Sequence, residues 1–141
     1  MQTKVIAFYE DHWMPPGTDH AQWDHLCRAY GADLQMVRSW EEAVIPEGAR
    51  VYILDETGDF DLNVPSDIAD AMMAELGGLP QNIVLVFGRT AMDLPTFLPE
   101  GSWSASYRIG TPQPIPMFGV NAGAIALFSL HLLYLSMVEP A

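Results

Sequence analysis

This 141-residue sequence contains little cysteine and few Lys or Arg residues. Its one cysteine, Cys27, cannot form an internal disulfide, and no cluster of cysteines of the metal-binding kind exists. Six Lys and Arg residues stand against 18 Asp and Glu residues, which gives a net charge of −12. Nucleic-acid affinity comes largely from Lys and Arg that neutralise phosphates, so this balance opposes RNA or DNA binding by the chain alone. The charge balance is compatible with a basic partner, a small ligand or a local basic pocket.

Targeting and membrane signals are absent as well. The N-terminus lacks a basic segment followed by a long apolar stretch, so we expect no signal peptide; with the lone cysteine, this favours a reducing, cytoplasmic setting. Residues 120–138 have about the length of a membrane span, but Asn121, His131 and two serines interrupt them and no Lys or Arg flanks them. We therefore expect a buried core or interface helix there, and no membrane span.

Common catalytic and phosphate-binding motifs are also missing. The sequence contains no P-loop, Gly-x-Gly-x-x-Gly fingerprint, Gly-x-Ser-x-Gly elbow or His-Glu-x-x-His motif. Asp-His pairs occur at residues 11–12, 19–20 and 24–25, and both residue types can ligate divalent metals. Their spacing matches no metal motif, so we interpret them as solvated polar residues and expect no metal site.

Half of the residues are apolar and 17% are charged, which predicts one domain over residues 1–141 with a core of ordinary size. Apolar, strand-like segments occur at residues 4–9, 33–38, 51–54, 83–87 and 104–109. Helical patterns lie between or after them, at residues 19–30, from residue 39 up to the stop at residues 46–48, and at residues 65–76, 93–97 and 120–137. This alternation predicts an α/β fold, a Rossmann-like parallel sheet with helices on both faces. Ligands of such sheets bind at loops that leave the carboxyl ends of strands, here residues 55–59, 88–92 and 110–121.

Local signals define the ends of the helices. Thr18 or Asp19 is expected to cap the first helix and Gly31 to end it, and Asp24 and Arg28 form an i,i+4 pair on its surface. The tetrapeptide at residues 39–42 has the spacing of a capping box and predicts a short helix.

Three segments together resemble the TrmH-type SPOUT (α/β-knot) RNA ribose 2′-O-methyltransferases. Residues 8–37 resemble the opening of that family, with an apolar strand, a proline pair, a helix that ends in a small residue and Gly, and a second strand. Residues 83–95 (IVLVFGRTAMDLP) resemble its second motif. Residues 114–133 (PIPMFGVNAGAIALFSLHLL) resemble its third, an Ile-Pro-Met loop that leads into an Asn-opened helix.

The resemblance implies a trefoil knot near the C-terminus and a bent S-adenosylmethionine inside it, held mainly by backbone groups of the three loops. An apolar slot with backbone donors and acceptors suits adenine, and Gly and Pro build rigid loops that approach a ligand closely. The implied cofactor-binding residues are Leu54, Thr57, Phe87, Gly88, Ile115, Met117, Val120 and Ala124. The alternative is that the proline-rich loop 110–121 is only a tight connection.

The catalytic positions depart from the family pattern. The family carries an arginine on the first helix that is thought to assist deprotonation of the ribose hydroxyl, and the alignment places His25 there. A histidine can act as a general base near neutral pH, or His25 faces solvent beside Asp24. The second motif holds Arg89 but lacks the family's Glu and second Gly, and the third keeps Asn121 but not the preceding Ser. The candidates for chemistry are therefore His25, Arg89 and Asn121.

Three functions remain open on this basis. The first is a divergent S-adenosylmethionine-binding SPOUT methyltransferase, such as an RNA 2′-O-methyltransferase. The second is a non-catalytic, dimeric binding or structural module of the same fold, and the third a flavodoxin-like domain with an unrelated ligand. The C-terminal helix is apolar on nearly all sides, and SPOUT proteins usually dimerise through it, so we expect a homodimer with Phe128, Leu132 and Leu135 facing outward.

Overall fold

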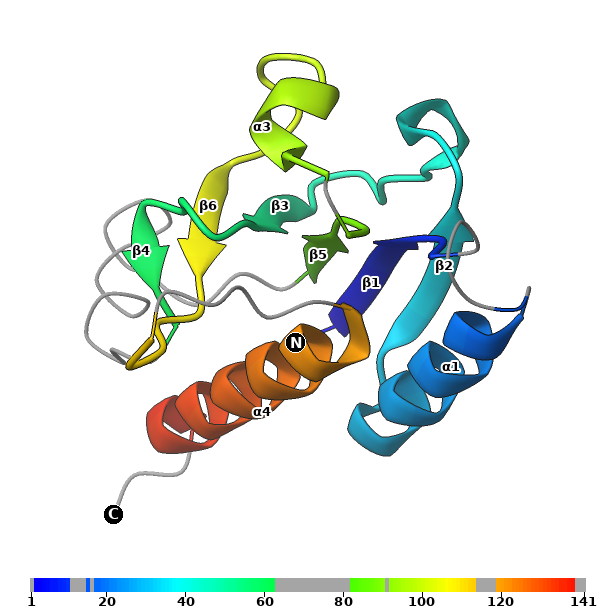
Figure 1. Ribbon diagram of the computed structural model, residues 1–141. Coiled ribbons are helices and arrows are strands. Elements are labelled where there is room, and N and C mark those ends of the chain that lie inside the picture. The colour runs from blue at the N-terminus through cyan, green and yellow to red at the C-terminus, as the bar shows by residue number, and fades with distance from the viewer. Residues whose placement is uncertain are drawn as a thin grey trace.

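The structure is a computed structural model that describes residues 2–10, 15, 17–62, 82–90, 92–113 and 119–138. Its strands are β1 (Gln2–Phe8), β2 (Asp33–Val37), β3 (Arg50–Leu54), β4 (Phe60–Asp61), β5 (Asn82–Phe87) and β6 (Ala105–Arg108). Its helices are α1 (Thr18–Tyr30), the short 3-10 helix η1 (Trp40–Glu42), α3 (Leu94–Phe97) and α4 (Gly119–Val138) (Figure 1). The helix expected at residues 65–76 lies outside the described residues, as does the whole segment 114–118.

The strands form one sheet in the order β2-β1-β5-β3-β6-β4, and every neighbouring pair is parallel. The predicted parallel sheet is thus confirmed, with each of the five expected strands in place. The two-residue strand β4 was not expected, because it follows the acidic loop and is too short to show any alternation. It extends the sheet by pairing with β6 at Phe60–Tyr107 and Asp61–Arg108.

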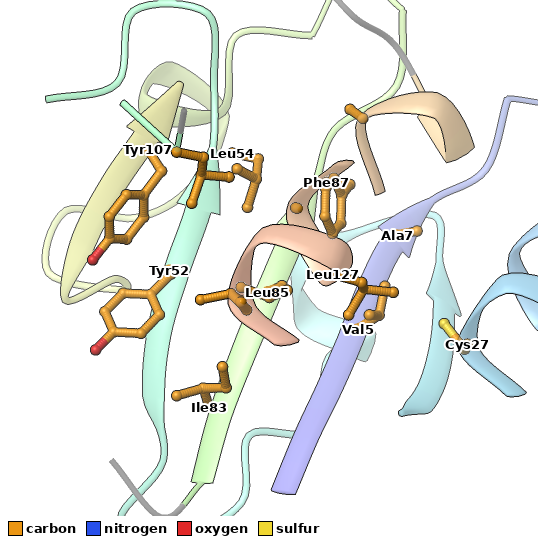
Figure 2. Close-up of a cluster of buried hydrophobic side chains, with 14 of the residues drawn as sticks. Val5, Ala7, Cys27, Tyr52, Leu54, Ile83, Leu85, Phe87, Tyr107 and Leu127 are labelled. Atoms are coloured by element: carbon orange, nitrogen blue, oxygen red, sulfur yellow. The ribbon is translucent and has the colours of Figure 1, made fainter. Parts of the chain in front are cut away.

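Two cores cover the two faces of the sheet. On one face, α1 and α4 lie side by side and pack against alternate strand residues (Figure 1). These strand residues are Val5, Ala7, Tyr52, Leu54, Ile83, Leu85, Phe87 and Tyr107 (Figure 2). The intervening residues form the second core with Leu94 and Leu98 of the α3 region and with Trp40 of η1. Helices therefore lie on both faces, and the β5 segment is buried on both, as its unbroken apolar run predicted.

The start of helix α1 differs from the expectation. Its N-cap is Gly17, in the left-handed conformation with φ 87°, and no side chain caps the helix. Asp19 is buried and accepts the backbone N–H of Glu10 at 2.7 Å, so the prediction of Thr18 or Asp19 as the cap was wrong. The tertiary contact outcompetes the local cap that the sequence pattern indicated.

The other local predictions are confirmed. Gly31 ends α1 with φ 68° and donates to the carbonyl of Arg28. The capping box of Ser39 and Glu42 opens η1, although this helix ends at Glu42, before the expected stop at Pro46. Nε of Arg28 lies 2.9 Å from Oδ2 of Asp24 on the exposed side of α1. Among the described helices, α4 included, none is both long and apolar enough to cross a membrane.

Candidate functional site

The carboxyl ends of the central strands form one row across the sheet. Leu54 pairs with both Phe87 and Tyr107, and Phe87 pairs with Ala7 on its other side (Figure 2). Because the strands are parallel, the chain leaves all of them at this edge. The loops after β1, β3, β5 and β6 therefore meet here, where ligands of open α/β sheets bind.

Three of the eight expected cofactor-binding residues belong to the core on the sheet face that α1 and α4 cover. Leu54 and Phe87 are buried, and the partly buried Val120 of the first turn of α4 packs against the same cluster. Phe87 also contacts Trp23 of α1, with 4.9 Å between the ring centroids. Residues that the sequence separates by more than 30 positions thus share one core.

The other expected cofactor residues have different surroundings. Gly88 follows Phe87 directly and is half-buried, and Ala124 is half-buried one turn into α4. Thr57 is exposed, and its hydroxyl donates to Oδ2 of Asp55 at 2.5 Å. Ile115 and Met117 lie outside the described residues.

The loop after β3 is tied to β6 through its backbone. The N–H of Asp55 donates to the carbonyl of Tyr107 at 2.9 Å, and Nη1 of Arg108 donates to the carbonyl of Gly58 at 2.7 Å. A Cβ at Gly58 would lie 2.2 Å from the carbonyl carbon of Tyr107, so only glycine permits this approach. The loop therefore has a defined shape without a ligand.

The loop after β6 is held in a similar way. The N–H of Gly110 donates to Oδ1 of Asp61 at 3.1 Å, and a Cβ at Gly110 would lie 2.3 Å from the other carboxylate oxygen. The N–H of Leu62 donates to the carbonyl of Arg108 at 2.9 Å. The short strand β4, which the sequence did not reveal, thus anchors the start of the third expected ligand loop.

The loop after β5 is held by a residue that the sequence analysis missed. The backbone N–H of Thr90 donates to Oε1 of Glu10 at 2.5 Å, and Glu10 is only 3% exposed. An acidic residue directly after an apolar strand was the available signal, but its partner lies 80 positions away in the chain.

The candidates for chemistry are not joined to one another. His25 is exposed on α1, Asn121 is exposed in the first turn of α4, and Arg89 is half-buried in the loop after β5. Within the described residues, no hydrogen bond links any two of them. The solvent-facing alternative for His25 thus agrees with its exposure, while the catalytic roles stay predictions.

Cys27 has the properties of a packing residue. It is buried between α1 and the sheet, and burial, with the nearby carboxylates of Asp24 and Asp33, raises the pKa of its thiol to about 11. The thiolate is therefore scarce near neutral pH, and a nucleophilic role is disfavoured. In the part of the chain that the structure describes, no three His, Cys, Asp or Glu side chains gather as metal ligands; the pair at residues 11–12 lies outside it.

Comparison with solved structures identifies the fold. The chain is similar to a Bacillus anthracis protein with the provisional name RNA methyltransferase, at 15% identity and a TM-score of 0.63, over 93% of each chain. It is also similar to a structure described as giving insights into the 2-OH methylation of C/U34 on tRNA, at 16% identity and a TM-score of 0.61, over 95% of this chain and 92% of that chain. No protein-family model and no curated protein matches the sequence.

These likenesses span almost the whole of both chains, so the fold is that of RNA methyltransferase structures. They agree with the resemblance of the three sequence motifs to SPOUT methyltransferases. At 15–16% identity they define the fold and leave the reaction to be argued from the site.

Proposed function

We propose that this protein is a divergent, S-adenosylmethionine-binding methyltransferase of the SPOUT type, with a trefoil knot in its C-terminal part and a ribose 2′-hydroxyl of RNA as the methyl acceptor. One observation carries the proposal. In the part of the chain that the structure describes, Phe87 of the second motif and Val120 of the third belong to the same core as Leu54, and Leu54 and Phe87 are neighbours at the carboxyl ends of β3 and β5. Both solved structures described above are named for RNA methylation.

The residues at this edge fit such a cofactor. Leu54 and Phe87 expose 9% and 2% of their surface, so they serve as an apolar floor and leave most direct contacts to loop backbones. The close approaches at Gly58 and Gly110 give two of these loops a fixed backbone. Pre-formed loops of this kind lower the entropy lost on binding. Thr57, Gly88, Ala124, Ile115 and Met117 would complete the contacts under this proposal.

Bound S-adenosylmethionine supplies an electrophilic methyl group, and the chain must then manage the proton of the acceptor hydroxyl. His25 is exposed on α1, and its imidazole is the group of this chain that would take this proton under the proposal. Arg89 and Asn121 offer a cation and an amide from the β5 loop and the start of α4, groups that can orient the acceptor.

The charge of the chain bears on the acceptor. A net charge of −12 opposes contact with phosphates, so we expect the isolated protein to bind RNA poorly at physiological salt. A basic partner would then present the substrate. Fluorescence anisotropy with a labelled RNA at several salt concentrations measures this. Tight, salt-sensitive binding by the protein alone would contradict the expectation.

A second candidate is a dimeric binding or structural module that has lost methyl transfer. It is favoured by the exposed His25 in place of the family's arginine and by the missing Glu and Ser of the second and third motifs. The fold and the α4 surface serve both functions equally well.

Calorimetric titration with S-adenosylmethionine and with S-adenosylhomocysteine separates the candidates. Saturable binding with a micromolar Kd supports the methyltransferase. Absence of binding to both compounds overturns it in favour of the module. Titration with flavin mononucleotide, followed by quenching of flavin fluorescence, tests the flavodoxin-like alternative in the same preparation.

A further inference from the structure

We propose that Glu10 is a positioning residue of the candidate site, which sets the backbone of the loop after β5 and is itself held by Asp19. The inference rests on the proposed function, because it concerns one of the loops that would grip S-adenosylmethionine. Neither residue is among the positions that the family resemblance assigns.

Strand register brings Glu10 to this loop. Ala7 of β1 pairs with Phe87 of β5, and Glu10 and Thr90 each lie three positions further along their chains. The two segments therefore continue next to each other beyond the sheet. There the N–H of Thr90 donates to Oε1 of Glu10 at 2.5 Å, where strand pairing has already ended.

Asp19 completes the connection. Its Oδ2 accepts the backbone N–H of Glu10 at 2.7 Å, and its Oδ1 accepts the N–H of His20 at 3.0 Å. Asp19 stands in the first turn of α1. Two carboxylates thus join the start of α1, the end of β1 and the loop after β5.

The carboxylates of Glu10 and Asp19 are both buried, and this burial bears on their role. Besides the tyrosines, the buried polar side chains among the described residues are those of Glu10, Asp19 and Ser106. All three accept backbone N–H groups of segments at the carboxyl edge, since Oγ of Ser106 accepts the N–H of Asp59 at 3.0 Å. A buried carboxylate is costly unless it is hydrogen-bonded, and apolar packing often stabilises a fold equally well.

The role of Glu10 follows from this arrangement. A hydrogen bond to an ionised carboxylate is stronger than one between neutral groups, so it fixes the peptide of Thr90 and with it the course of residues 88–90. A loop that already has its bound shape loses less entropy when the ligand arrives. Loss of the carboxylate should therefore weaken cofactor binding more than it harms the fold.

The test compares Glu10→Ala, Glu10→Gln and Asp19→Asn with Lys4→Gln as a matched control. Nζ of Lys4 donates to Oε1 of Gln35 at 2.9 Å. Lys4 lies in β1, the strand that leads to Glu10, but toward the amino end of that strand and away from the site. We expect Glu10→Ala to raise the Kd for S-adenosylhomocysteine about tenfold, as loss of one charge-assisted hydrogen bond does. Glu10→Gln should restore part of the affinity because its amide oxygen still accepts, and Lys4→Gln should bind as the wild type does.

Amide hydrogen exchange at Thr90 is measured by NMR on the same proteins without ligand. Slow exchange in the wild type, fast exchange in Glu10→Ala and partial recovery in Glu10→Gln support the inference. Unchanged Kd or unchanged Thr90 exchange in Glu10→Ala overturns it. If the wild type binds no S-adenosylhomocysteine, the proposed function fails, and the exchange data alone then decide whether Glu10 positions the loop.

Discussion

Trp23 of α1 lies directly against Gly123 of α4, so closely that a Cβ at Gly123 would stand 2.3 Å from the indole ring. The indole also contacts Phe87 of β5, with ring centroids 4.9 Å apart. One tryptophan thus fills the space between both helices and the carboxyl end of the central strand. The absence of a side chain at residue 123 is what allows α4 to approach α1 this closely.

Replacing Gly123 by Ala should therefore destabilise the protein. In a free helix this change is favourable by roughly 0.5–1 kcal/mol. Here the added methyl group meets a buried ring, and overpacking of a core costs about 1–3 kcal/mol. We expect a net loss in the free energy of unfolding, measured by urea denaturation. Ser129→Ala, on the half-buried side of the same helix, is the control and should change the free energy little; an equally stable Gly123→Ala would contradict this packing.

Much of the fold could be predicted from the sequence, because its signals are local. The unbroken apolar run of β5 predicted a strand buried on both faces, and the capping box at residues 39–42 predicted η1. Asp19 shows where local reasoning fails. Its position before a helical pattern indicated a cap, but its carboxylate binds the N–H of Glu10 in the folded chain.

The candidate site was predictable in outline only. Parallel topology places the loops after β3 and β5 at one edge, whatever the side chains are. The contacts that shape those loops join residues about 50 to 80 positions apart, such as Arg108 with Gly58 and Thr90 with Glu10. The pattern of apolar and polar residues within a short stretch of sequence cannot predict contacts between residues so far apart. The strand β4 was not predicted for the same reason, because only its pairing with β6 defines it as a strand.

Gly88 gives a direct test of the loop after β5. Its backbone is not in the left-handed region, but a Cβ there would lie 3.2 Å from Cγ of Leu94 and 3.4 Å from Sδ of Met92. A larger side chain must push the loop away from α3 or toward the space expected for the ligand. We expect Gly88→Val to weaken S-adenosylmethionine binding at least about tenfold while the protein stays folded.

Calorimetry gives the affinity of this variant, and circular dichroism with thermal unfolding verifies the fold. Gly88→Ala serves as the graded comparison, because its single methyl group requires a movement of only a few tenths of an ångström. Unchanged affinity in Gly88→Val would remove this loop from the site.

The raised pKa of Cys27 predicts that the free energy of unfolding falls at alkaline pH. Burial raises the pKa of its thiol from 9.0 to about 11 in the folded state. The folded protein therefore holds the proton more tightly than the unfolded chain. This contribution to stability is complete below pH 9 and is lost as the pH rises through about 11.

Urea denaturation between pH 8 and 11 measures this loss, and Cys27→Ala is the comparison. The variant should lack the part of the pH dependence that comes from the thiol. A thiol reagent should also modify Cys27 at pH 8 only when the protein is unfolded. Rapid labelling of the folded protein would show that the thiol is accessible.

The exposed face of α4 predicts self-association. Phe128 and Leu132 are 51% and 49% exposed, whereas Leu127, Leu130 and Leu133 of the same helix are buried against the sheet. Leu135, the third residue expected to face outward, is half-buried. Apolar side chains one turn apart on an exposed helix face suit an isologous two-fold contact, in which each helix covers the other.

Leu132→Glu should convert such a dimer to a monomer or make the protein insoluble, because a charge without a partner at an apolar interface is costly. Multi-angle light scattering at high micromolar concentration measures the mass. Val44→Glu is the matched control, since Val44 is 64% exposed and lies outside α4, in the loop between η1 and β3; it should leave the mass unchanged. A wild-type protein that stays monomeric at these concentrations would refute the α4 interface.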